Sequence, residues 1–169
     1  MVFGWLRKKE TLTVVQTKKL SRKAASDELT KRGEDLANEN RLDEALECFD
    51  NAIEVYPQND FAWGDKGLML DKKGNIVEAM AAFSKAIDLN PTNPITWYNK
   101  GLTLIKSNKL APAIECFDKA IENDHGYAKA WYNKGRALSL LGKTEESQQC
   151  FNTARKLDPL LFTKVRRMK

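Results

Sequence analysis

Residues 94–127 read PITWYNKGLTLIKSNKLAPAIECFDKAIENDHGY, and this stretch decides the fold of the chain. Two groups of its residues recur at helical spacing, first Trp97, Gly101 and Leu104 and then Ala113, Phe117 and Ala120. Asn93 and Pro94 suit the start of the first helix, because an Asn side chain caps free backbone N–H groups and Pro lacks an N–H that would be unpaired there. The stretch therefore predicts a pair of helices.

The same residues return every 34 positions, and no insertion interrupts the register between residues 26 and 161. The recurring series are Trp63, Trp97 and Trp131; Gly33, Gly67, Gly101 and Gly135; Phe49, Phe83, Phe117 and Phe151; Ala52, Ala86, Ala120 and Ala154; and Pro57, Pro91 and Pro159. An uninterrupted period of this length indicates a stack of helical repeats. We predict four units, which span residues 26–59, 60–93, 94–127 and 128–161.

Glycine has two different tasks in the predicted units. The Gly at position 8 of the unit lets the paired helix lie close, with the Phe at position 24 filling the space beside it. Gly74, which precedes Asn75, and Gly142 instead mark tight turns between paired helices, where a left-handed backbone conformation is useful.

The pattern Trp-x-x-x-Gly, then Ala-x-x-x-Phe-x-x-Ala, then a closing Pro resembles the tetratricopeptide repeat and covers about four-fifths of the chain. The resemblance implies an all-α protein, in which antiparallel helix pairs stack into a right-handed α-α superhelix. It also implies that the first helices line a concave groove where partners bind as peptides. The departures are few: Leu29 stands in place of Trp, His125 in place of Pro and Ser147 in place of Ala.

The two ends of the chain are basic, whereas the middle is mildly acidic. Residues 1–25 carry seven Lys/Arg against the single acid Glu10, and residues 160–169 carry four Lys/Arg and no acid. We predict that the N-terminal extension, residues 1–25, is partly helical, from about Lys18, and otherwise mobile. The apolar spacing in residues 160–169 predicts a C-terminal capping helix, which a solenoid requires to cover its last repeat.

Several roles for the basic ends remain open. They could solubilise the protein, or they could bind a nucleic acid through its phosphates. Phe3 and Trp5 next to a run of cations could contact an anionic membrane surface, so a peripheral tether with the solenoid as its body is the alternative function. The apolar start could also occupy a groove, its own or a neighbour's, which would give autoinhibition or self-association.

The sequence offers no constellation for catalysis, for a metal or for a cofactor. The one histidine, His125, takes a connector position, and Cys48, Cys116 and Cys150 share one repeat position beside the packed Phe. Their spacing is inherited from the repeat, so we expect neither an enzyme nor a metal site. No apolar run approaches the roughly 20 residues that span a bilayer, and the N-terminus does not resemble a secretory signal, so we expect a cytoplasmic protein.

The first helix of each unit has a second stripe of residues, at positions 2, 5, 9 and 12, that its own packing does not use. In the superhelix that the resemblance implies, this stripe points into the groove. With the neighbouring positions 6 and 13 it gives the candidate peptide-binding residues, which are Phe61, Leu68, Ile95, Tyr98, Asn99, Leu102, Ile105, Lys106, Lys129, Tyr132, Asn133 and Arg136.

The stripe is acidic in the first unit, apolar in the third and basic with an aromatic residue in the fourth. We expect its apolar members to bind a partner, because they exceed what packing between units needs. A scaffold role stays open as the alternative for four of the candidates, namely Tyr98, Tyr132, Asn99 and Asn133.

The expected function is that of an adaptor, and the expected partner is a protein or peptide with apolar anchors. Its acidic or C-terminal end should lie toward Lys129 and Arg136. Within the family, a carboxylate clamp grips the tails of chaperones with Lys, Asn and Arg side chains. Asn99 and Lys129 match the pattern of that clamp, but Leu68 and Asn133 do not, which argues against a chaperone tail as the partner.

Overall fold

The computed structural model of the chain describes residues 2–161, and it describes side chains from residue 16 to residue 161. Over residues 2–161 the chain forms eight α-helices and no strand. The helices are α1 (Val2–Asn38), α2 (Leu42–Val55), α3 (Asp60–Lys72), α4 (Ile76–Leu89), α5 (Pro94–Lys106), α6 (Leu110–Asn123), α7 (Ala128–Leu140) and α8 (Thr144–Leu157).

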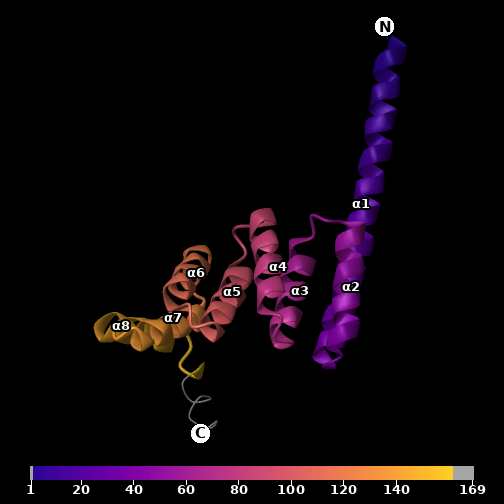
Figure 1. Cartoon of the computed structure of the whole chain (residues 1–169). Helices are drawn as coiled ribbons and strands as arrows, with labels where there is room; N and C mark the ends of the chain where they lie inside the picture. Colours follow the sequence, from indigo (N-terminus) through magenta and orange to yellow (C-terminus); the bar gives the residue numbers. More distant parts are fainter. Residues whose placement is uncertain (1, 162–169) are drawn as a thin grey trace.

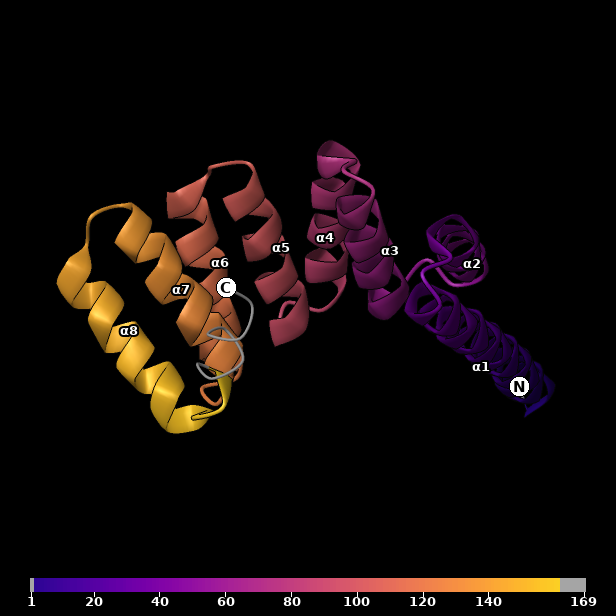
Figure 2. The same cartoon turned by 90° about the horizontal axis from the view of Figure 1, so that it is seen from below.

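The helices pack as successive hairpins, α1 with α2, α3 with α4, α5 with α6 and α7 with α8. Each hairpin leans on the next, because α2 contacts α3, α4 contacts α5 and α6 contacts α7. Figures 1 and 2 show the hairpins following one another along the molecule in the order of the sequence. The prediction of an all-α helical-hairpin solenoid is confirmed.

The glycine at position 8 and the phenylalanine at position 24 form the tightest contact within each hairpin. Phe49, Phe83 and Phe117 are completely buried. A Cβ atom added to Gly33 would lie 2.5 Å from an atom of the Phe49 ring, and the other three hairpins repeat this close approach. Small side chains surround the ring, since Ala45, Ala79 and Ala113 are also fully buried. The predicted task of this glycine is confirmed.

The turn inside each hairpin has a left-handed residue at the same repeat position. Gly74 has a φ of 84° and Gly142 a φ of 77°, as the sequence predicted. Asn40 and Asn108 occupy the equivalent positions, with φ values of 62° and 55°. In each turn the next N–H bonds to a carbonyl five residues back, at 2.9–3.0 Å, which satisfies an end carbonyl of the helix.

The tryptophan at position 4 binds the segment that joins one hairpin to the next. Its indole Nε1 donates to the carbonyl of position 32 of the preceding unit, at 3.0 Å for Trp63 to Pro57, and the other two tryptophans repeat the bond. In the last case the acceptor is the carbonyl of His125, whose side chain is exposed. This bond uses only the backbone of position 32, so His125 replaces Pro without loss of the contact.

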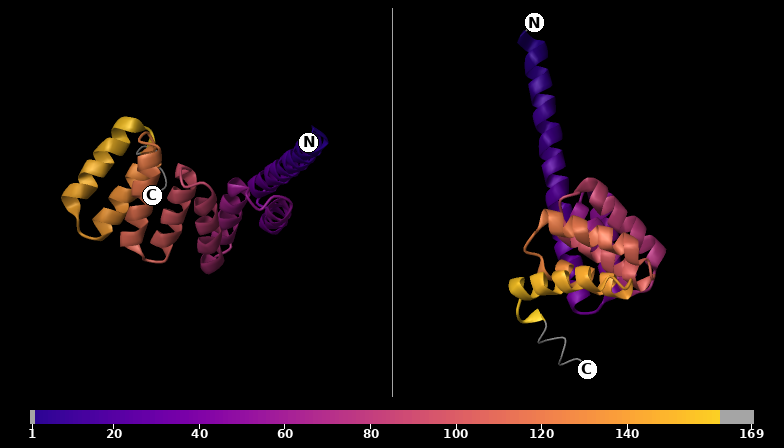
Figure 3. Two further views of the ribbon diagram at one scale, coloured as in Figure 1. Left: turned by 90° about the horizontal axis from the view of Figure 1, so that it is seen from above. Right: turned by 90° about the vertical axis from the view of Figure 1, so that its left-hand side faces the viewer.

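Helix α1 is longer than the sequence predicted. A helix was expected only from about Lys18, whereas α1 begins at Val2 and crosses residue 25 without a break. Between Gly4 and Gly33 the sequence contains no Gly and no Pro, so nothing there interrupts a helix. Figures 1 and 3 show that α1 projects well beyond the stacked hairpins.

The capping helix predicted for residues 160–169 lies almost entirely outside the described residues. Within them, Leu160 is exposed and Leu161 is partly buried at the end of the last repeat. The capping helix and the limits of the four units remain predictions.

Candidate functional site

The cysteines and the histidine occupy scaffold positions. Cys48, Cys116 and Cys150 are buried and free, and burial raises the pKa of the thiols of Cys116 and Cys150. A raised pKa leaves a thiol less able to act as a nucleophile or a metal ligand. Among the described side chains, no group of three or more His, Cys, Asp or Glu could hold a metal ion.

The odd-numbered helices together form one surface. Helix α3 contacts α1 and α5, and α5 contacts α7, so the first helices of the hairpins lie next to one another. We call the face that carries positions 2, 5, 9 and 12 of these helices the inner surface. All the candidate peptide-binding residues belong to α3, α5 and α7, and they differ in how far they are exposed.

The apolar candidates divide into two kinds. Phe61 and Ile95 are 58% and 56% exposed. Leu68, Leu102 and Ile105 are only partly exposed, because each packs against the buried core of a hairpin. Phe61 and Ile95 are therefore the apolar side chains that a partner could cover without disturbing the scaffold.

Tyr98 and Asn133 belong to a network that joins the third hairpin to the fourth. Asn133 is buried, and its Nδ2 donates to the Tyr98 hydroxyl at 3.1 Å. The Tyr98 ring lies 5.0 Å from the ring of Tyr127. Arg136 then donates from Nη1 to Asn133 Oδ1 at 3.0 Å, although the rest of its side chain is exposed. These contacts favour the scaffold alternative for Tyr98 and Asn133.

The remaining candidates are partly engaged with the scaffold. Lys106 Nζ lies 2.5 Å from the buried carboxylate of Asp71, which also accepts a bond of 3.0 Å from the Thr103 hydroxyl. Tyr132 packs its ring against Phe151, with centroids 5.5 Å apart. Lys106, Lys129 and Arg136 are nevertheless exposed, whereas Asn99 and Tyr132 are only partly exposed.

Asp65 is a site residue that the sequence did not single out. Asp65 lies on α3 and faces Glu34 of α1. Burial and the charge of Glu34 raise the pKa of the Asp65 carboxyl to about 7. The two acids line a hollow of about 280 Å³ whose other walls include Leu68 and Lys72. Both acids stand at groove positions of their units, so the pattern contained them, but the partial burial of Asp65 beside the exposed Glu34 depends on how α1 packs on α3.

A second polar network that the sequence did not reveal joins the first two hairpins. Asn59 Nδ2 donates to Ser26 Oγ at 2.9 Å and to Thr30 Oγ1 at 3.0 Å. Ser26 is fully buried and donates in turn to the carbonyl of Ala52 at 2.8 Å. This network adds to the bond that Trp63 makes between the same two hairpins.

None of the helices, over the part of the chain described, combines the length and the apolar character that crossing a membrane needs.

Solved structures share this arrangement of helices. A structure of Pseudomonas aeruginosa pilF superposes with a TM-score of 0.78 at 18% identity, over 82% of this chain and 64% of that chain. MamA from Desulfovibrio magneticus RS-1, residues 41 to the end, gives 0.71 at 22% identity, over 79% of this chain and 76% of that chain. At these identities the likeness concerns the fold.

A third structure was solved with a peptide. The second tetratricopeptide repeat domain of Spaghetti (RPAP3), bound to the HSP90 peptide SRMEEVD, superposes with a TM-score of 0.58 at 28% identity, over 60% of this chain and 94% of that chain. A search of curated proteins by sequence gives no match.

Sequence profiles of one family match the repeats themselves. Profiles described as tetratricopeptide repeat match residues 30–94, 94–127 and 116–149, which together reach from the first hairpin into the fourth. The matched span contains the Trp and Gly positions of the hairpins and the Phe positions of the first three, whose contacts build them. The chain belongs to the tetratricopeptide repeat family.

Proposed function

We propose that this protein is a non-catalytic adaptor that binds a segment of a partner protein along the inner surface. The observation that carries the proposal is the exposure of Phe61 and Ile95, large apolar side chains on neighbouring helices of one rigid scaffold. Exposed apolar side chains that share a surface mark interaction sites more often than chance would place them there. The RPAP3 domain bound to the peptide SRMEEVD supports binding of a peptide by this kind of fold.

The charge of the inner surface gives the bound segment a direction. Lys129 and Arg136 are exposed on α7, whereas Glu34 and Asp65 lie together where α1 meets α3. An acidic or C-terminal end of the partner should therefore lie toward α7, with its apolar anchors on Phe61 and Ile95. Charge complementarity of this kind determines orientation and specificity more than it determines affinity.

The test uses the exposed apolar side chains, because their replacement leaves the core intact. The full chain with Phe61→Ser and Ile95→Ser is compared with the wild type as bait, and captured proteins are identified by mass spectrometry. Val77→Ser serves as the matched control, because Val77 is 79% exposed on α4, outside the inner surface. We expect at least one partner to be captured by the wild type and the control but lost with the inner-surface variant.

A second variant tests the direction of the bound segment. Lys129→Glu with Arg136→Glu should weaken binding of the captured partner by about tenfold, since each lost charge contact at a surface contributes up to ~1 kcal/mol. If the Val77 variant loses the same partners as the inner-surface variant, the inner surface is not the site. If the Lys129 and Arg136 variant binds the partner as tightly as the wild type, the direction is wrong.

A further inference from the structure

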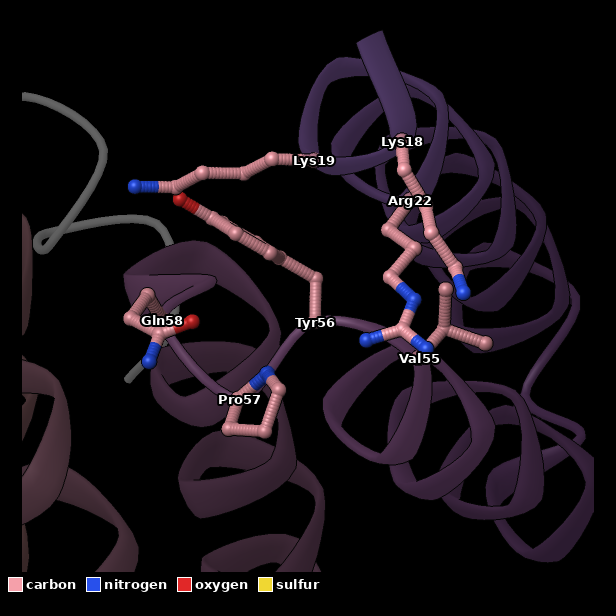
Figure 4. Close-up of a pocket in the computed structure, with 7 residues that line it drawn as sticks. All are labelled: Lys18, Lys19, Arg22, Val55, Tyr56, Pro57 and Gln58. Carbon is pink, nitrogen blue, oxygen red and sulfur yellow. The ribbon is translucent and has the colours of Figure 1, made fainter. Parts of the chain in front are cut away.

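A basic hollow lies where α1 leaves the solenoid. All ten residues from 16 to 25 are exposed, so this part of α1 has no helix packed along it. Beside it, the end of α2 and the segment that follows close a hollow of about 270 Å³. Figure 4 shows the residues that line it, which are Lys18, Lys19, Arg22, Val55, Tyr56, Pro57 and Gln58.

The three cations of this hollow have no acidic partner among the described side chains. Lys23, one residue further along α1, pairs with Asp27 at 2.9 Å, but no ion pair forms at Lys18, Lys19 or Arg22. Lys18 and Arg22 are four residues apart on one helix, a spacing at which like charges repel and destabilise the helix. A partner with negative charge would remove this repulsion.

The arrangement of the side chains favours an extended anion over a compact one. In Figure 4 the Tyr56 ring stands between the cations: Lys19 reaches the side of the Tyr56 hydroxyl, while Lys18 and Arg22 point toward Val55. The head group of Lys19 and those of Lys18 and Arg22 thus point to different sides of the Tyr56 ring and do not converge on one point. A chain with several carboxylates could contact all three, and the apolar atoms of Val55 and Pro57 would lie under its backbone.

We propose that this hollow, the α1 basic pocket, binds an acidic stretch of a partner protein. Its walls come from α1 and from the body of the protein at residues 55–58, so cations and apolar atoms line one hollow, which suits a polypeptide with acidic side chains. The pocket shares no residue with the candidates of the inner surface. It is therefore a second docking site, which goes beyond the proposed function.

The test measures binding of a fluorescein-labelled peptide of alternating Glu and Gly to the full chain by fluorescence anisotropy. Lys19→Gln with Arg22→Gln should weaken binding by about tenfold, because two surface charge contacts are lost. Lys31→Gln with Arg32→Gln is the matched control, since it removes the same charge from the same helix outside the pocket. We expect the control to bind almost as tightly as the wild type, and a Gln-and-Gly peptide not to bind.

Four outcomes would overturn the proposal. Equal weakening in the pocket variant and the control would mean diffuse attraction to a basic helix. Loss of binding in the Lys129→Gln, Arg136→Gln variant alone would place the acidic peptide on the inner surface. Binding to vesicles of phosphatidylserine or to a DNA duplex, without binding of the acidic peptide, would assign the cations to a different ligand. A wild-type chain that binds none of the probes would show that the pocket holds no anion.

Discussion

Gly101 lies so close to Phe117 that a Cβ atom on Gly101 would come within 2.6 Å of the Phe117 ring. The ring is fully buried and holds α6 against α5. We predict that Gly101→Ala lowers the free energy of unfolding by about 1–3 kcal/mol, because the methyl group forces the ring and the two helices apart. Urea denaturation followed by circular dichroism measures the change.

Gly64 is the matched control for this prediction. It also lies inside a helix, but a Cβ atom there would meet nothing closer than the Thr96 hydroxyl at 3.5 Å. Gly64→Ala should therefore stabilise the protein by about 0.5–1 kcal/mol, since Ala favours the helix over Gly. Equal destabilisation by both substitutions would mean that the contact with Phe117 is not what requires Gly101.

The hairpin turns give a second prediction, in which one substitution lowers the stability of the protein and the other does not. Gly74 has a φ of 84° and open space around its Cα, so Gly74→Ala should cost about 1–2 kcal/mol from backbone strain alone. Asn108 has a φ of 55° at the equivalent position, so Asn108→Gly should be neutral or slightly stabilising. Urea denaturation of both variants checks the pair, and destabilisation by Asn108→Gly would contradict it.

These two features differ in how well the sequence could predict them. The contact of Gly101 with Phe117 could be predicted, because both residues recur in every unit and a packing role inferred for them in one unit applies to all. The left-handed conformation of Asn40 and Asn108 was missed, because Asn is compatible with many backbone conformations. The signal available for it was that both residues occupy the repeat position of Gly74. The length of α1 was missed for another reason: residues 16–25 are all exposed, and a stretch of helix without a buried face leaves no apolar period to detect.

The candidate site was less predictable than the fold. The stripe located Phe61 and Ile95 correctly on neighbouring helices, since spacing determines the face of a helix. It could not separate exposed side chains from those that complete the scaffold, because Tyr98 and Asn133 meet across two hairpins. The pKa of Asp65 depends on burial between helices, which no local pattern encodes.

Asp65 makes the stability of the protein depend on pH. Burial and the charge of Glu34 raise its pKa to about 7, against about 3.9 in an unfolded chain. Between these values the folded state binds the proton more tightly than the unfolded state, so stability falls as the pH rises from about 4 to about 7. Above about pH 7 Asp65 is ionised in both states, and its destabilising effect no longer changes with pH.

Asp65→Asn should remove this dependence. We expect the variant to be more stable than the wild type by roughly 1–3 kcal/mol near pH 8, and most of the difference to be lost near pH 3, which lies below the pKa of Asp65 in both states. Urea denaturation at both pH values measures it. Asp88→Asn is the control, because it removes the same charge at an exposed position of α4. A gain from Asp65→Asn that is equal at both pH values would mean that the carboxylate does not titrate between them.

The hydrogen bond between Asn133 and Tyr98 allows a test of whether these two residues stabilise the scaffold or bind a partner. Asn133→Ala leaves the Tyr98 hydroxyl without its donor and removes the acceptor of Arg136. Because an unmet buried polar group costs about 1–3 kcal/mol and Tyr98 is only partly buried, we expect the free energy of unfolding to fall by about 1 kcal/mol. Tyr98→Phe removes the hydroxyl instead and leaves the Asn133 amide bonded to the Lys129 carbonyl at 3.0 Å, so it should cost less.

If both residues serve the scaffold, the double variant should lose less stability than the sum of the two single variants, because the same bond is removed only once. Affinity for a partner captured through Phe61 and Ile95 should change little in Tyr98→Phe, since the ring keeps its contacts with Phe117 and Tyr127. A Tyr98→Phe protein that keeps full stability but loses the partner would instead make the Tyr98 hydroxyl a binding group of the inner surface.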